Sequence, residues 1–218
     1  MFPELTAVKP PLAIRPEYVV DHDATFIVQQ QGKGLSSGKF AVFQPDGKPI
    51  TGDPKINSNE SLPSHTIMYV DGKFGSLEAK RSFCDASGLP LFDLYHKFAR
   101  VTWYVELPGK TDTAIARLSP RASILKDNLE VTVKNLAANG EETTLHVQGQ
   151  DIWKQRTNVF LGEKVVMTAK RTDKWSVYVP GKKLEWQVDI ATGFDIALAS
   201  VIVVVLAANM YDSSMQSS

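Results

Sequence analysis

The pattern of hydrophobic and polar positions is most unusual near the C-terminal end. Residues 193–210 read GFDIALASVIVVVLAANM, and from Ile196 to Ala208 there is no charged residue and a single hydroxyl, on Ser200. A helix that is apolar on every side must be enclosed by protein or by lipid. The stretch is long for a strand, and Asp195 stands where a helix N-cap belongs. The pattern therefore predicts a buried helix that the rest of the chain surrounds.

Two alternatives start from the same stretch. Its β-branched run at residues 201–205 would suit a strand. A membrane span is the second alternative, but Ile196 to Met210 would be roughly 22 Å long as a helix at about 1.5 Å per residue. A bilayer core is about 30 Å thick, and no Lys or Arg follows to anchor the far side. The length favours a core helix over a tail anchor.

The remainder of the chain shows short alternating segments separated by turn residues. The cleanest alternation is residues 129–134 (LEVTVK), which places Leu129, Val131 and Val133 on one face. Asn139-Gly140 follows and signals a hairpin turn. About a dozen such segments recur at intervals of roughly 8–12 residues, as is typical of a β-sandwich or barrel. No repeat and no linker divides them.

Some segments fall outside this pattern. Residues 1–17 are proline-rich and are predicted to be an irregular N-terminal lead-in, with a first strand at residues 18–20. Residues 44–66 contain four prolines and two glycines, which predicts a surface loop. Residues 213–218 are predicted to be a disordered tail. We therefore expect a single domain over residues 18–212.

A long antiparallel sheet must protect its edges, and closure into a barrel removes them. A barrel of about eight strands is filled by its own side chains, whereas a can of about eleven strands holds a central helix. The fold class that we predict is therefore mainly β. It is a closed antiparallel barrel of about twelve strands that encloses the hydrophobic C-terminal helix.

The charge balance and the cysteine count exclude several classes of function. Lys plus Arg and Asp plus Glu both number 24, so the basic excess of a nucleic-acid-binding protein is missing. Cys84 is the single cysteine, which excludes an internal disulfide and a multi-cysteine metal site, and we interpret it as a buried strand residue. The N-terminus lacks the basic and apolar regions of a signal peptide. We expect a cytoplasmic monomer, peripheral at a membrane if it binds lipid.

Two segments resemble a known family. Residues 80–92 (KRSFCDASGLPLF) contain the pattern R-x-x-x-D-x-x-G-x-P-L-F, and Trp103 follows on the next predicted strand. Residues 186–195 (WQVDIATGFD) lead directly into the apolar helix. Over residues 20–212 this order of parts resembles the LURP-one-related (LOR) family. That family belongs to the Tubby C-terminal-like superfamily, together with Tubby domains and phospholipid scramblases.

The resemblance implies a closed twelve-stranded barrel around a central helix. It also implies a role in defence, stress or membrane-lipid signalling rather than in catalysis, and no specific biochemical activity for the LOR branch. Tubby domains bind phosphoinositides, but their basic ligands have no position-by-position match in this sequence. Scramblases carry a palmitoylated cysteine cluster, which this sequence lacks because Cys84 stands alone.

Isolated polar residues are interpreted as structural. Asp85 is predicted to cap a hairpin turn with Gly88 at positive φ. Asp195 is predicted to cap the helix and complement its dipole, rather than to hold a cation together with Asp189. Ser200 is predicted to bond back to the preceding helical turn.

Basic residues suggest the one surface chemistry that the sequence favours. They are densest at Lys170-Arg171 with Lys174, and at Lys182-Lys183. Clustered Lys and Arg attract anionic lipid headgroups, so these residues are the candidate lipid contacts. No catalytic, cofactor-binding or metal-binding residues are predicted, because the sequence contains no Gly-rich phosphate loop, catalytic triad signature or metal motif.

The sequence thus favours a non-enzymatic LOR-type barrel that acts as a binding or adaptor module. Its expected partners are anionic lipid headgroups, such as phosphoinositides, or another protein, in signalling or stress response. One alternative is a scramblase-like or tail-anchored protein whose helix lies in lipid. Another is an enzyme or small-ligand carrier that uses a lumen beside the helix.

Overall fold

The structure is a computed structural model. It describes residues 3–31, 38–45, 65–72, 80–96, 101–110, 113–121, 128–150, 156–172 and 184–216. Its regular elements are a short 3-10 helix η1 (Pro16–Tyr18), strands β1 (Ala24–Gln30), β2 (Phe40–Phe43), β3 (Thr66–Gly72), β4 (Arg81–Asp85), β5 (Pro90–His96), β6 (Trp103–Glu106), β7 (Ala114–Pro120), β8 (Asn128–Asn135), β9 (Glu141–Gly149), β10 (Arg156–Leu161), β11 (Lys164–Arg171) and β12 (Glu185–Ile190), and helix α1 (Ile196–Gln216).

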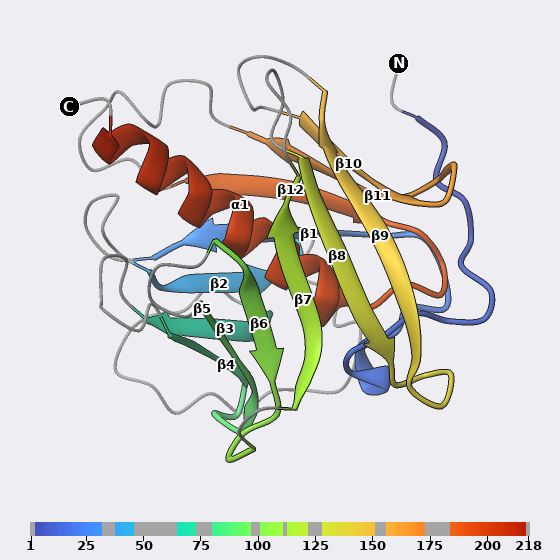
Figure 1. Cartoon of the computed structure of the whole chain (residues 1–218), viewed down its shortest axis with the longest axis horizontal. Helices are drawn as coiled ribbons and strands as arrows, with labels where there is room; N and C mark the ends of the chain where they lie inside the picture. The colour runs from blue at the N-terminus through green and yellow to red at the C-terminus, as the bar shows by residue number, and fades with distance from the viewer. Residues whose placement is uncertain are drawn as a thin grey trace.

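The strands form one closed antiparallel barrel. Each strand pairs with its neighbours in sequence, and β1 pairs with β12 to complete the circle. Figure 1 shows α1 running along the inside of this wall and extending beyond it at the C-terminal end. The predicted fold class is therefore confirmed.

Strand β8 shows how the sequence builds the wall. Its residues alternate between the interior and the outer face, as the period of two requires. Leu129, Val131 and Val133 are at most 2% exposed, whereas the side chains between them lie on the outer face and are only partly buried or exposed. The alternation in the sequence thus predicted both the strand and its inward face.

Helix α1 fills the interior. No residue from Ile196 to Ala208 is more than 7% exposed. All of them except Ser200 belong to the same apolar cluster as the inward-facing residues of the strands. The β-branched run is helical because packing on all sides outweighs intrinsic propensity. The Ser200 hydroxyl donates to the Ile196 carbonyl at 2.8 Å, which confirms the predicted bond to the preceding turn. Among the residues that the structure describes, no helix is long and apolar enough to cross a membrane.

The N-terminal segment packs across the end of the barrel where α1 begins. The backbone N–H groups of Val8 and Leu12 donate to the carbonyls of Thr192 and Gly193 at 2.8 and 2.9 Å. Gly193 has φ +84°, and the Val8 carbonyl lies where a Cβ would stand, so only glycine fits there. Residues 3–15 of this proline-rich segment form no helix or strand, and they contribute buried residues such as Leu12 and Ile14 to the core.

Two local predictions differ from the structure. Residues 18–20 were expected to begin the sheet, but Tyr18 ends η1 and Val19 makes only an isolated bridge to Asp195. Pro16 starts η1, where its fixed φ suits a helical turn. In addition, α1 continues to Gln216, so most of the predicted tail is helical. Of the predicted loop at residues 44–66, residues 46–64 lie outside the described residues.

Candidate anion-binding site

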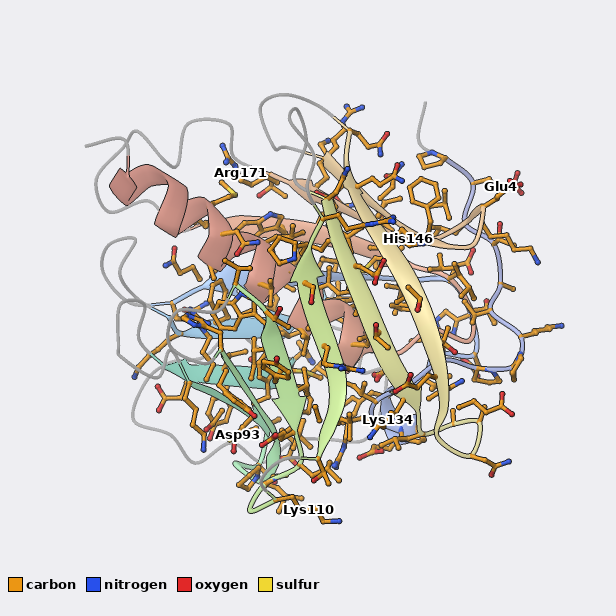
Figure 2. All side chains as sticks on the ribbon, viewed as in Figure 1. Glu4, Asp93, Lys110, Lys134, His146 and Arg171 are labelled. Atoms are coloured by element: carbon orange, nitrogen blue, oxygen red, sulfur yellow. The ribbon has the colours of Figure 1, made fainter. Side chains whose placement is uncertain are left out.

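The two described residues of the predicted basic cluster lie at the end of β11. Adjacent strand residues point to opposite faces, and Arg171 is 5% exposed while Lys170 is partly exposed. The Lys170-Arg171 pair is therefore divided between the interior and the outer face, and Lys170 is the member that reaches the outside. Figure 2 labels Arg171 at this end of the barrel. Lys174, Lys182 and Lys183 lie outside the described residues.

Arg156 brings a second cation to Lys170. It lies on β10 directly opposite Lys170 in the antiparallel register, where Cβ atoms are typically about 4.5–5.5 Å apart. Both residues line a hollow of about 150 Å³ in the outer wall, together with Asn158 and Thr168 of the same two strands. Pro3 also lines it. We call this feature the β10–β11 hollow.

The lining of the β10–β11 hollow suits an anion. Arg156 and Lys170 place two positive charges opposite each other on paired strands, and an anion that sits between them would interact with both. The Asn158 amide supplies a neutral hydrogen-bond donor, whereas the Thr168 hydroxyl donates to the Asp189 carboxylate at 3.4 Å. A volume of about 150 Å³ corresponds to about five water molecules at ~30 Å³ each, which is enough for a phosphate group.

The neighbouring strand β12 contributes one carboxylate near this region, on Asp189. Its oxygens accept hydrogen bonds from Thr25 at 2.7 Å, Gln187 at 3.3 Å and Thr168 at 3.4 Å. Asp189 lies on the partly exposed face of β12, whereas Asp195 is fully buried. The structure therefore does not bring these two carboxylates together around a cation. No group of three or more His, Cys, Asp or Glu side chains that could hold a metal ion occurs among the described residues.

Arg156 is not among the candidate lipid contacts predicted from the sequence. The sequence nevertheless contains part of the information needed to pair Arg156 with a residue of β11. The turn at Gly162-Glu163 makes β10 and β11 a hairpin, so counting outward from the turn pairs their residues. A bulge between Val159 and Phe160 shifts the register by one residue. Simple counting would therefore have paired Arg156 with Ala169 and missed Lys170.

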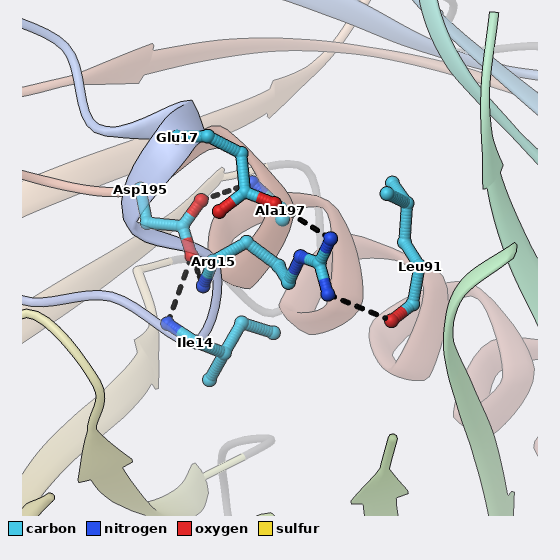
Figure 3. Close-up of polar contacts among 6 residues, drawn as sticks. All are labelled: Ile14, Arg15, Glu17, Leu91, Asp195 and Ala197. Atoms are coloured by element: carbon cyan, nitrogen blue, oxygen red, sulfur yellow. Dashed lines mark hydrogen bonds and ion pairs between the residues drawn. The ribbon is translucent and has the colours of Figure 1, made fainter. Parts of the chain in front are cut away.

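Asp195 caps α1 as predicted (Figure 3). Its Oδ1 accepts the N–H of Ala197 at 2.7 Å, and its Oδ2 accepts the N–H groups of Ile14 and Arg15 at 2.9 and 3.0 Å. Burial raises the pKa of Asp195 to about 7, against the hydrogen bonds, which lower it. The Arg15 guanidinium turns away from this carboxylate and pairs with Glu17 at 2.6 Å. These contacts fix the helix start and the N-terminal segment to each other.

The β4–β5 turn is also structural, as predicted. The Asp85 Oδ1 accepts the backbone N–H groups of Ser87 and Leu89 at 2.8 and 2.9 Å, and Gly88 has φ +93°. Cys84 is 9% exposed, and burial raises the pKa of its thiol. A raised thiol pKa disfavours the reactive thiolate, so this cysteine serves the strand rather than a nucleophilic site.

Comparison with known proteins identifies the family. The profile of the family described as LURP-one-related (LOR) matches residues 24–207, which is most of the chain. A solved crystal structure of a protein from Arabidopsis thaliana is similar, with a TM-score of 0.58 and 17% identity, over 88% of this chain and 94% of that one. At this identity the likeness concerns the fold. The comparison with curated proteins finds no match. With its closed barrel and central helix, the chain belongs to the LURP-one-related (LOR) family.

Proposed function

We propose that this LOR-family barrel is a non-catalytic binding module for anionic membrane surfaces. A phosphate-bearing lipid headgroup, such as that of a phosphoinositide, would occupy the β10–β11 hollow. The observation that carries this proposal is the register that sets Arg156 directly opposite Lys170 in a hollow that the Asn158 side chain also lines. In signalling or stress response, such a module would act as an adaptor that brings a protein partner to the membrane.

The two cations have complementary chemistry toward phosphate. Arginine offers a planar fork that binds two phosphate oxygens, and lysine acts as a compact point charge. Each basic residue near an anionic membrane surface contributes about 1 kcal/mol. Two such residues give weak and salt-sensitive association. Lys174, Lys182 and Lys183 follow β11 in sequence and stay in the proposal as further contacts.

The membrane-inserted alternative has no comparable support. It requires α1 to leave the barrel and enter lipid. The residues from Ile196 to Ala208 are instead enclosed by the barrel wall, and their removal would leave its interior unfilled. A peripheral contact through the outer wall keeps the core intact.

Vesicle flotation tests the proposal. We expect the protein to float with phosphatidylcholine vesicles that contain phosphatidylinositol bisphosphate, and to remain behind with phosphatidylcholine alone. The double variant Arg156→Gln/Lys170→Gln should weaken binding about 30-fold, because two contacts of about 1 kcal/mol each are lost. Lys164→Gln is the matched control, since Lys164 is exposed at the opposite end of the same strand.

A triple variant separates the hollow from the neighbouring basic residues. Replacing Lys174, Lys182 and Lys183 by glutamine should reduce binding further in the Arg156→Gln/Lys170→Gln background. If the triple variant abolishes binding while the double variant binds like the control, the hollow is not the site. Absence of flotation at low salt would contradict lipid binding altogether.

A further inference from the structure

A second and larger hollow lies in the outer wall over strands β5 to β8. Its volume is about 300 Å³, at the lower end of the range for small-molecule sites. We call it the tyrosine hollow. The residues that define it chemically are Tyr95, Tyr104, Glu106, Arg117, Thr132 and Lys134.

Two tyrosines form one wall of the tyrosine hollow. Tyr95 and Tyr104 are directly opposite each other on β5 and β6, and their rings are stacked with centroids 5.8 Å apart. The Tyr95 hydroxyl donates to Glu106 Oε1 at 2.6 Å. The pair therefore presents a flat aromatic surface next to a carboxylate.

Glu106 is a nearly buried carboxylate with little compensation. A bulge between Val105 and Glu106 interrupts the register, and the Glu106 side chain lines the outer hollow while it is only 7% exposed. In the part of the chain that the structure describes, its side chain receives the Tyr95 hydrogen bond and no ion pair. A buried charge is costly unless it is paired and hydrogen-bonded. Asp93, directly opposite on β5, adds like charge and is itself paired with Lys80 at 3.1 Å.

The other side of the tyrosine hollow is positive. Arg117 and Lys134 line it together with Glu142, whose Oε1 lies 3.8 Å from Arg117 Nη2. Both side chains of this ion pair are more than half exposed, so the pair contributes little to stability. Lys134 makes no ion pair with any described residue. Arg117, Lys134 and Glu142 together give this side of the hollow a net charge of one positive unit. Glu106, on the other side, carries one negative charge.

The spacing of the charges sets the size of a ligand. Glu106 and Lys134 stand on β6 and β8, with β7 between them, so their backbones are about 10 Å apart at about 4.8 Å per strand. The residues of β7 between them, Ala114 and Ile115, line the floor. The side chains of Glu106 and Lys134 both line the hollow, so a ligand that reaches both must be small. Figure 2 shows Asp93 and Lys134 on either side of this part of the wall.

We propose that the tyrosine hollow binds a small zwitterion, namely a free amino acid. Its ammonium group lies against the Glu106 carboxylate, and its carboxylate lies between Lys134 and Arg117. An aromatic or aliphatic side chain packs on the Tyr104 ring. The ammonium group supplies the charged donor that Glu106 lacks among the described residues, and the paired opposite charges disfavour a purely anionic ligand. This site is separate from the β10–β11 hollow and does not depend on lipid binding.

Titration of the full-length ¹⁵N-labelled protein with L-phenylalanine tests the proposal by NMR. Amide resonances of β5 to β8 should shift and saturate. N-acetyl-phenylalanine lacks the cation and phenylalaninamide lacks the carboxylate, and each should bind about tenfold more weakly because one charge-assisted contact is lost. Equal affinity for the three compounds, or no shifts with any of them, would overturn the proposal.

Variants locate the site. Glu106→Gln and Lys134→Gln should each weaken phenylalanine binding about tenfold. Glu141→Gln is the matched control, because Glu141 is an exposed carboxylate on β9 that does not line the hollow. If Glu106→Gln does not fold, the Lys134→Gln variant still tests the site, because the Lys134 side chain is exposed and can be replaced without disturbing the core. Wild-type affinity in Lys134→Gln would refute the proposed site.

Discussion

Asp195 is the residue at which opposing physical effects meet most directly. Its carboxylate is fully buried and accepts N–H groups from both α1 and the N-terminal segment. Hydrogen bonds of this kind stabilise the charged form, whereas burial disfavours it. Burial is the larger effect and raises the pKa of Asp195 to about 7. The folded protein therefore binds the proton of this carboxyl group more tightly than the unfolded chain does.

A pH dependence of stability follows from this shift. Because the folded protein binds this proton more tightly, protonation of Asp195 stabilises the folded state. This contribution to the free energy of unfolding is fully present below about pH 4, the ordinary pKa range of an aspartate, and is lost as the pH rises through about 7. We expect the difference in unfolding free energy between wild type and Asp195→Asn to decrease by more than ~1 kcal/mol between pH 4 and pH 7, measured by urea denaturation. Glu163→Gln, in the β10–β11 turn, controls for removing a carboxyl group elsewhere. A difference that increases with pH would contradict the assignment.

Residues with local roles were predictable, and residues with distant partners were not. The Asp195 cap, the Ser200 bond and the Asp85 turn depend on a few neighbouring residues, so the sequence contains their signals. The Arg156–Lys170 pair depends on a bulge that shifts the register by one residue. Glu106 likewise lies at a bulge, and nothing in the local sequence marks it as the carboxylate of a hollow.

Among the elements, α1 depends most on its surroundings. Its run of β-branched residues has poor helix propensity, and the helix persists because it is enclosed. Leu198 is fully buried in the first half of this helix. Its side chain therefore reports how tightly the barrel packs around α1.

Leu198→Ala should lower the free energy of unfolding by about 2–5 kcal/mol, because it leaves a cavity that a rigid wall cannot close. Urea denaturation measures this loss. Leu89→Ala is the matched control: Leu89 is 59% exposed, and its replacement should change stability by less than about 0.5 kcal/mol. Similar effects in the two variants would mean that α1 is not tightly packed.

The elements also differ in how well the sequence predicted them. Strand β8 was identified by its period of two, because its inward face is buried and its outer face is solvated. The segment at residues 18–20 is also apolar, yet its backbone bonds to the start of α1 instead of joining the sheet. The backbone N–H of Val20 donates to the Phe194 carbonyl at 3.1 Å. That contact joins distant parts of the chain and has no local signature.

At the scale of the whole molecule, closing the sheet leaves two ends to be covered. At the end where α1 begins, the N-terminal segment provides the cover. Leu12 and Ile14 are at most 1% exposed, and Ile14 also donates its N–H to Asp195. The predicted domain begins after this segment, but the segment makes hydrogen bonds to the start of α1, so we expect barrel, helix and segment to unfold together.

Deletion of residues 1–14 tests this coupling. Burial of each of Leu12 and Ile14 is worth about 1.5–3 kcal/mol, and loss of the Ile14 N–H removes a donor from the buried carboxylate of Asp195. We therefore expect a fall of several kcal/mol in unfolding free energy and a lower melting temperature by calorimetry. Deletion of residues 1–5 is the control, because the described hydrogen bonds of the segment begin at Thr6. Equal melting temperatures for the two deletions would show that the barrel holds its helix without this cover.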